Sequence, residues 1–110
     1  MKKTIALSII IFALTSCFTA KITKTAIQTT SDKQSTLSTV AQSDNNAHVR
    51  YLAVQKLTDQ SALSTIAQSD ADVEVRKLAV QKVTSQSTLS TVAQSDTDTE
   101  VRKLAVKRLK

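Results

Sequence analysis

The sequence predicts an all-α protein, a short α-solenoid built from three helix–turn–helix repeats. The chain repeats itself with a period of 26 residues and no gap, in units that span residues 32–57, 58–83 and 84–110. The second and third units are identical at 18 of 26 positions, and each unit carries two apolar stripes with helical spacing. A fixed period of this length is typical of proteins in which each unit packs only on its neighbours.

The first half of the middle unit predicts a short helix. Leu63, Ile66 and Ala67 occupy positions i, i+3 and i+4, so they share one face of that helix. Either Thr58 or Asp59 can begin it, because both side chains can accept a hydrogen bond from a free backbone N–H group. A helix of about ten residues is too short to be stable alone in water. We therefore expect it to depend on packing against its neighbours.

The second half of the same unit predicts a helix with a wider apolar stripe. Val75, Leu78, Ala79 and Val83 have helical spacing, and Val80 lies beside the centre of the stripe and widens it. A wide stripe suits a helix that packs against a repeat on each side.

Residues 69–72, Ser-Asp-Ala-Asp, separate the two halves and predict the turn inside the hairpin. The chain contains no Gly and no Pro, so we expect Ser, Asp, Asn and Thr to form the turns. Asp72 precedes Arg76 by four residues, which predicts an ion pair within the second helix. In the third unit, Thr97 and Glu100 fit the pattern of a capping box.

Residues 75–83, which follow an Asp-rich turn, resemble the second helix of a HEAT repeat. They are most similar to the short bacterial HEAT units related to phycobilisome lyases, and the resemblance extends over residues 32–109. It implies that turn aspartates and second-helix arginines pair in a ladder along the stack. The residues at these positions are Asp44, Asp70 and Asp96, together with Arg50, Arg76 and Arg102.

Three features depart from the HEAT pattern. The period is shorter than the usual length of roughly 40–47 residues, and the turns lack the frequent proline. A basic residue stands near the end of each second helix, where HEAT repeats commonly have a small one. These basic residues are Lys56, Lys82 and Arg108. The departures bear on the curvature of the solenoid more than on its helical hairpins.

Residues 1–16 predict a signal peptide. Two lysines precede a ten-residue stretch, residues 5–14, which is apolar except for Ser8 and is too short to span a bilayer comfortably. Residues 14–17, Leu-Thr-Ser-Cys, resemble a bacterial lipobox, which implies that Cys17 is acylated and begins the mature chain. We therefore expect a lipoprotein anchored to a membrane of the bacterial cell envelope. Ordinary secretion and an uncleaved hydrophobic anchor are the alternatives.

Residues 17–31 connect the acylation site to the repeats and allow two interpretations. The segment is rich in Thr and poor in large apolar residues, as in a tether. Alternatively it is a degenerate half-repeat that caps the stack, with one extra residue before Gln34. In that alignment Ile22, Ala26, Ile27 and Gln28 match Val49, Ala53, Val54 and Gln55. Phe18, rather than Asp, follows the cysteine, which favours the outer membrane in proteobacterial lipoproteins.

The composition argues against several classes of function. The formal net charge is +6, but only 3% of the residues are aromatic, so we expect no binding of nucleic acid by base stacking. His48 is the only histidine, and no serine or threonine has a positioned base, so we expect no enzymatic activity, no cofactor and no small-molecule substrate. The Asp-rich turns contain no glycine and too few carboxylates for a Ca²⁺ loop, so we expect no metal.

The outer face of the second helices is the predicted binding surface. Stacking aligns Tyr51, Lys77 and Lys103 in one row, and the HEAT resemblance implies a concave face where partners bind. Tyrosine is a common anchor in protein interfaces. We expect a non-enzymatic interaction module that binds an envelope protein or peptide and is held to the membrane by its lipid. The alternatives are a HEAT-like enzyme-associated factor, lyase-like or DNA-acting, and a purely structural repeat protein.

Overall fold

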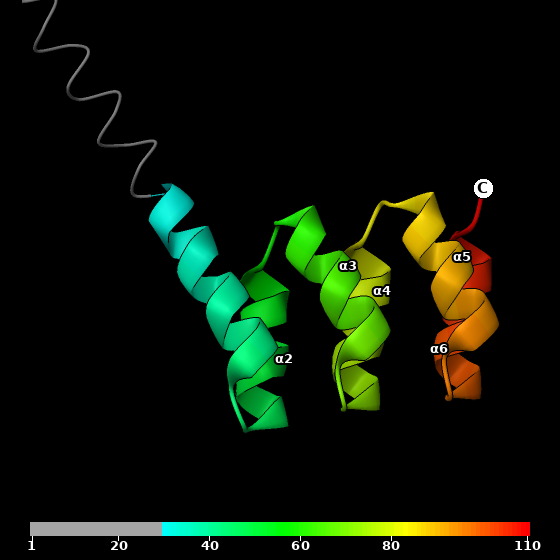
Figure 1. Ribbon diagram of the computed structural model, residues 1–110, viewed down its shortest axis with the longest axis horizontal. Coiled ribbons are helices and arrows are strands. Elements are labelled where there is room, and N and C mark those ends of the chain that lie inside the picture. Colours follow the sequence, from blue (N-terminus) through cyan, green and yellow to red (C-terminus); the bar gives the residue numbers. More distant parts are fainter. Residues whose placement is uncertain (1–29) are drawn as a thin grey trace, which may run out of the picture. The chain divides into compact units, whose positions relative to one another are not determined.

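The computed structural model describes residues 30–110. In this part of the chain six helices form three consecutive hairpins (Figure 1). The helices are residues 30–43, α2 (Ala47–Lys56), α3 (Gln60–Ser69), α4 (Val73–Lys82), α5 (Gln86–Ser95) and α6 (Thr99–Arg108). The predicted all-α stack of helical hairpins is therefore confirmed. The expected signal peptide, residues 1–16, and all but the last two residues of segment 17–31 lie outside the described residues.

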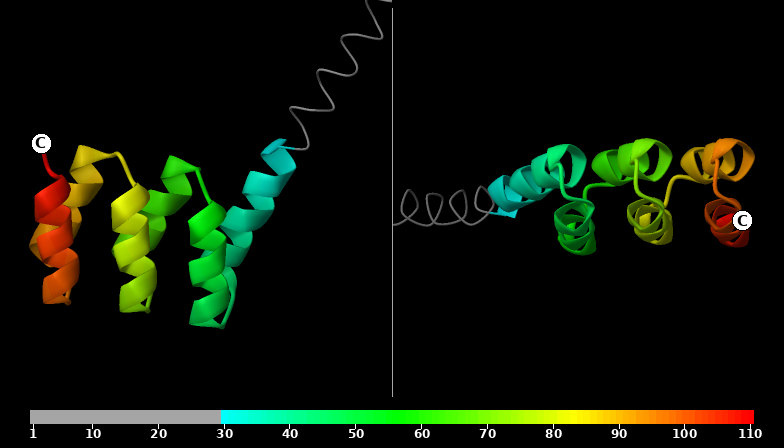
Figure 2. Two further views of the ribbon diagram at one scale, coloured as in Figure 1. Left: turned by 180° about the vertical axis from the view of Figure 1, so that it is seen from behind. Right: turned by 90° about the horizontal axis from the view of Figure 1, so that it is seen from below.

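The hairpins of residues 34–110, which form one compact unit, are arranged in two layers (Figure 2). The first helices of the hairpins lie in one layer, and the second helices α2, α4 and α6 lie in the other. Each hairpin packs on the next, because α4 contacts both α2 and α6 while α3 contacts α5. Two residues that are 26 positions apart in the sequence therefore occupy equivalent places in neighbouring repeats.

Side-chain caps begin each helix from α2 to α6 at the positions where the turns were expected. Asp59, rather than Thr58, begins α3, and its carboxylate accepts the N–H of Ser61. Asp72 begins α4 and accepts two N–H groups of its first turn. The capping box expected from Thr97 and Glu100 is not formed, because Asp98 takes the same role at α6 and accepts the N–H of Glu100.

The turns need no glycine because their backbone stays in ordinary regions. None of the described residues has a positive φ angle. Each helix from α2 to α6 ends in a residue with an extended backbone, for example Asp70 after α3. The Asp70 carboxylate then accepts the N–H of Asp72 at 2.9 Å, which closes the turn with a side chain. Asp96 and Asp98 repeat this contact.

The two predicted stripes meet in one apolar core that runs through the stack. Leu63 and Ile66 of α3 and Val75 of α4 are almost fully buried. Val80, which widens the α4 stripe, and Val83, which follows α4, are fully buried as well, because α4 has a repeat on each side. The core is therefore formed both within and between hairpins, as the marginal length of each helix requires.

Candidate binding surface

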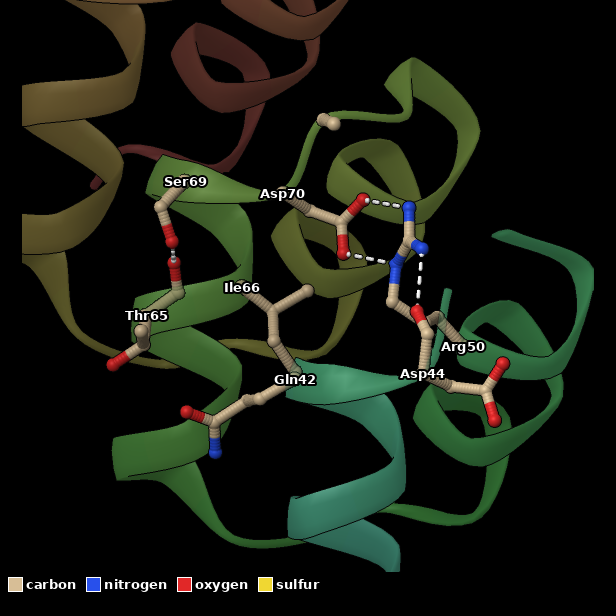
Figure 3. A pocket seen from close by; sticks show the side chains of 8 residues that line it. Gln42, Asp44, Arg50, Thr65, Ile66, Ser69 and Asp70 are labelled. Atoms are coloured by element: carbon tan, nitrogen blue, oxygen red, sulfur yellow. Dashed lines mark hydrogen bonds and ion pairs between the residues drawn. The ribbon is translucent and has the colours of Figure 1, made fainter. Parts of the chain in front are cut away.

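The turn aspartates and second-helix arginines meet between repeats. The guanidinium of Arg50 on α2 binds the carboxylate of Asp70 in the next repeat through two hydrogen bonds, Nε–Oδ2 at 2.9 Å and Nη2–Oδ1 at 3.1 Å (Figure 3). Its remaining nitrogen, Nη1, donates to the backbone carbonyl of Asp44 at 2.8 Å. Arg76 makes the same contacts with Asp96 and with the carbonyl of Asp70. We call each Arg–Asp pair of this kind a rung.

Both rungs are largely removed from water. The side chains of Arg50 and Asp70 are 12% and 5% exposed, and those of Arg76 and Asp96 are 9% and 4% exposed. The hydrogen bond to Asp70 raises the pKa of Arg50 above its ordinary value. A pocket of about 290 Å³ lies beside the first rung, and the charged groups of Arg50 and Asp70 in its lining already bind each other. The rungs therefore hold repeats together and leave no open charge for a ligand.

The ion pair expected within the second helix is not formed. The carboxylate of Asp72 caps α4, as described above, while Arg76 extends to Asp96 in the next repeat. Arg76 can pair either with Asp72 on its own helix or with Asp96 in the next repeat. The bidentate pair to Asp96 gives two charge-assisted bonds in a water-poor site, whereas an exposed i,i+4 pair contributes only about 0.2–0.5 kcal/mol.

The ladder is incomplete at both ends of the stack. Among residues 30–110, neither Asp44 nor Arg102 forms an ion pair. The carboxylate of Asp44 accepts the N–H of Asn46 at 2.9 Å. Arg102 donates to the carbonyl of Asp96 at 2.7 Å and to the Thr99 hydroxyl at 3.2 Å.

The basic residues near the helix ends have a role that sequence reasoning missed. Lys82 Nζ donates to the carbonyls of Val54 and Gln55, both at 2.7 Å, at the C-terminal end of α2 in the preceding repeat. Arg108 does the same to the carbonyls of Val80 and Gln81. These carbonyls carry the negative end of the helix dipole, so a cation is favourable there. Burial lowers the pKa of Lys82.

The predicted row on the second helices has mixed charge. Tyr51 and Lys77 are half-buried, and Lys103 is exposed. Lys77 binds Glu74 at 3.1 Å, and Lys103 binds Glu100 at the same distance. The two lysines are thus paired with acids one turn earlier on their own helices, so the row is not a continuous basic strip.

An open hollow lies at the N-terminal ends of α2 and α4 and includes the tyrosine of this row. Its volume is about 370 Å³, and it is lined by Ala47, His48 and Tyr51 of α2 together with Asp72 and Glu74. Asp72 caps α4 through Oδ1 and Glu74 binds Lys77 through Oε1, so among residues 30–110 the second oxygen of each carboxylate faces no contact of this kind. These oxygens and the aromatic ring suit a short peptide segment with a basic side chain, through ionic and cation–π contacts. The sequence indicated Tyr51, but the two acids come from the next repeat and appear only once the stack is formed.

Other predicted features lie elsewhere. Cys17 and the lipobox are outside the described residues. Within residues 30–110 no group of His, Cys, Asp and Glu side chains has the arrangement of a metal site. No helix in this same part of the chain is long and apolar enough to cross a membrane.

Comparison with known proteins finds no match to any family model, curated protein or solved structure. The fold itself defines the class of protein, a helical-repeat protein made of consecutive hairpins.

Proposed function

We propose that this chain is a non-enzymatic, HEAT-like binding module that holds a short segment of an envelope protein or peptide. The observation that carries the proposal is the hollow in which Tyr51 lies beside Asp72 and Glu74. Tyrosine contributes a large, amphipathic contact area, and residues of this type dominate the binding energy of many interfaces. The acids around it select a partner segment that carries lysine or arginine.

The HEAT-like assignment rests on the arrangement of the hairpins and their rungs. Two-helix units stack in register, and the arginine of each second helix binds the turn aspartate of the next unit. This pairing is the feature that the resemblance implied. The 26-residue period makes each unit smaller than an ordinary HEAT repeat, so the partner surface is small as well. We expect a peptide-sized ligand rather than a standard protein interface.

The proposed subcellular location is a membrane of the bacterial cell envelope, with the outer membrane favoured. Its support is the sequence of residues 1–17, a basic start, a ten-residue apolar core and a lipobox-like segment ending in Cys17. Two or three acyl chains hold a protein stably on a membrane, whereas one does not. The intact mass of the protein from its native membranes tests this: a chain beginning at Cys17 with added acyl mass is expected, and Cys17→Ser should lack that mass.

The binding face is tested by site-specific photo-crosslinking in intact cells. A photoreactive side chain in place of Tyr51 should give a discrete crosslinked product in the envelope. The same group in place of Gln68, an exposed residue of α3 in the other layer, is the matched control. The product at position 51 should decrease when Glu74→Lys is added. Equal products at both positions, or none at position 51, would reject this face and favour a purely structural repeat protein.

A further inference from the structure

The surfaces at the two ends of the described stack carry the same residue types as the two surfaces that meet between neighbouring repeats. Inside the stack an arginine of one repeat binds an aspartate of the next, at Arg50–Asp70 and Arg76–Asp96. At the C-terminal edge Arg102 occupies the arginine position of the rung. At the N-terminal edge Asp44 occupies the aspartate position. In the described part of the chain neither has an ion-pair partner, and their charges are opposite.

The exposed apolar residues are also matched between the two edges. Val54 and Val80 are fully buried by the repeat that follows them, whereas Val106 at the same position is 58% exposed. At the opposite edge Val49 is 37% exposed, although Val75 at the same position is fully buried by the repeat before it. The internal interface thus shows what each edge packs against when it is covered.

The carbonyl contact completes the match. Lys82 and Arg108 each donate to two carbonyls near the end of the second helix of the preceding repeat. Lys56 holds the same position in the first repeat, at the N-terminal edge. The corresponding carbonyls at the C-terminal edge are those of Val106 and Lys107 on α6.

We propose that a second copy of this chain covers each edge, so that the stack continues from one molecule into the next. Arg102 of one copy binds the carboxylate of Asp44 in the other, Val106 packs beside Val49, and Lys56 donates to the end of α6. The contact is heterologous, because it joins different surfaces on the two copies. It leaves one edge free at each end, so it produces linear oligomers rather than a closed dimer.

A second copy offers Asp44 the arginine that the chain's own preceding sequence lacks at the matching position. Residues 57–59 and 83–85 form the non-helical links that lead into the later hairpins, but residues 31–33, in the same register, are helical. The half-repeat alignment also places Thr23 in register with Arg50, and threonine cannot form the bidentate pair that Asp44 would accept.

Charge reversal tests the proposal, with the full chain purified in detergent and its mass distribution measured by sedimentation over a range of concentrations. Wild type should form a series of species that differ by one chain. Arg102→Asp alone and Asp44→Arg alone should each weaken association by at least about tenfold, because like charges then face each other. An equimolar mixture of the two variants should associate again, since each edge then meets an edge of opposite charge.

Glu100→Lys is the matched control on α6. Its side chain is 63% exposed, and Glu74, at the same position in the middle of the stack, is 68% exposed although a repeat flanks it on each side. This position therefore lies outside the interface, and the control should associate as wild type does. Circular dichroism should show the same helix content in all variants. A monomeric wild type, a single closed dimer, or folded variants that mixing does not rescue would each overturn the proposal.

Discussion

The rung between Arg76 and Asp96 should contribute more to stability than any other polar contact between repeats. Its two hydrogen bonds are 2.9 and 3.2 Å long, and its side chains are 9% and 4% exposed. Arg76→Met keeps the aliphatic stem but leaves the Asp96 carboxylate in a water-poor site without its cation. Removing one partner of a buried pair costs about 3–5 kcal/mol, and the residual exposure here lowers the expectation to about 2–4 kcal/mol.

A double-mutant cycle separates this pair from its surroundings. Asp96→Asn is a suitable second change, because its side-chain oxygen can still accept the N–H of Asp98, the contact that closes the turn. The free energy of unfolding is measured for wild type, both single variants and the double variant by urea denaturation followed by circular dichroism. The coupling energy should be about 1–3 kcal/mol. Low protein concentration keeps association between copies out of the measurement.

Arg102→Met provides the matched control for this cycle. Arg102 is the same residue in the same register, but within the described residues it binds only a carbonyl and a hydroxyl. Its loss should cost about 1 kcal/mol, because its guanidinium binds only neutral acceptors and is less buried than that of Arg76. A coupling below about 0.5 kcal/mol, or an equal cost for Arg102→Met and Arg76→Met, would refute the view that the buried ion pair stabilises the stack.

Three further predictions concern the core, a helix cap and the half-buried Lys82. Val80→Ala should lower the free energy of unfolding by about 1–3 kcal/mol, whereas Val106→Ala at the exposed edge should change it by less than about 0.5 kcal/mol; urea denaturation compares the two. Asp72→Ala should cost about 1 kcal/mol by the same assay, because two N–H groups of α4 lose their acceptor. Burial lowers the folded-state pKa of Lys82 below 10.5, so between that pKa and 10.5 the unfolded chain binds more protons and stability rises with pH. Relative to Lys82→Arg, which stays charged, wild type should gain stability as the pH approaches 10.5, and an unchanged difference would contradict this.

Much of the fold was predictable because the apolar stripes and polar turns that define the helices are local sequence patterns and occur in all three units. The stripe of Leu63, Ile66 and Ala67 predicted α3, and all three residues are buried in the core. The break at residues 69–72 predicted the hairpin turn, which the structure places between α3 and α4. Repetition also predicted stacking, because a hairpin of two ten-residue helices cannot bury its apolar face alone.

The polar contacts were harder to predict because their partners are distant in sequence. Asp72 and Arg76 satisfy a local pairing rule, but the rule does not count the carboxylate that Asp96 brings from 20 residues away. Lys82 was recognised as unusual without an explanation, since its acceptors are carbonyls 27 and 28 residues earlier. In both cases the contact becomes visible only after one repeat is placed on the next.

The shortness of the repeat gives these polar contacts their importance. Ten-residue helices are about 15 Å long, so each apolar interface is small, and a rung plus a lysine at the helix end adds specific contacts at two separate places. The near-identity of the units also affects the ends of the stack. Terminal repeats of solenoids usually replace apolar edge residues with polar ones. Here Val49 and Val106 retain the residue type that is buried inside the stack, and Asp44 and Arg102 retain the charges of a rung. Because the two edges carry the residues of the internal interface, they are complementary to each other. A second copy could therefore bind through the contacts that already join the repeats.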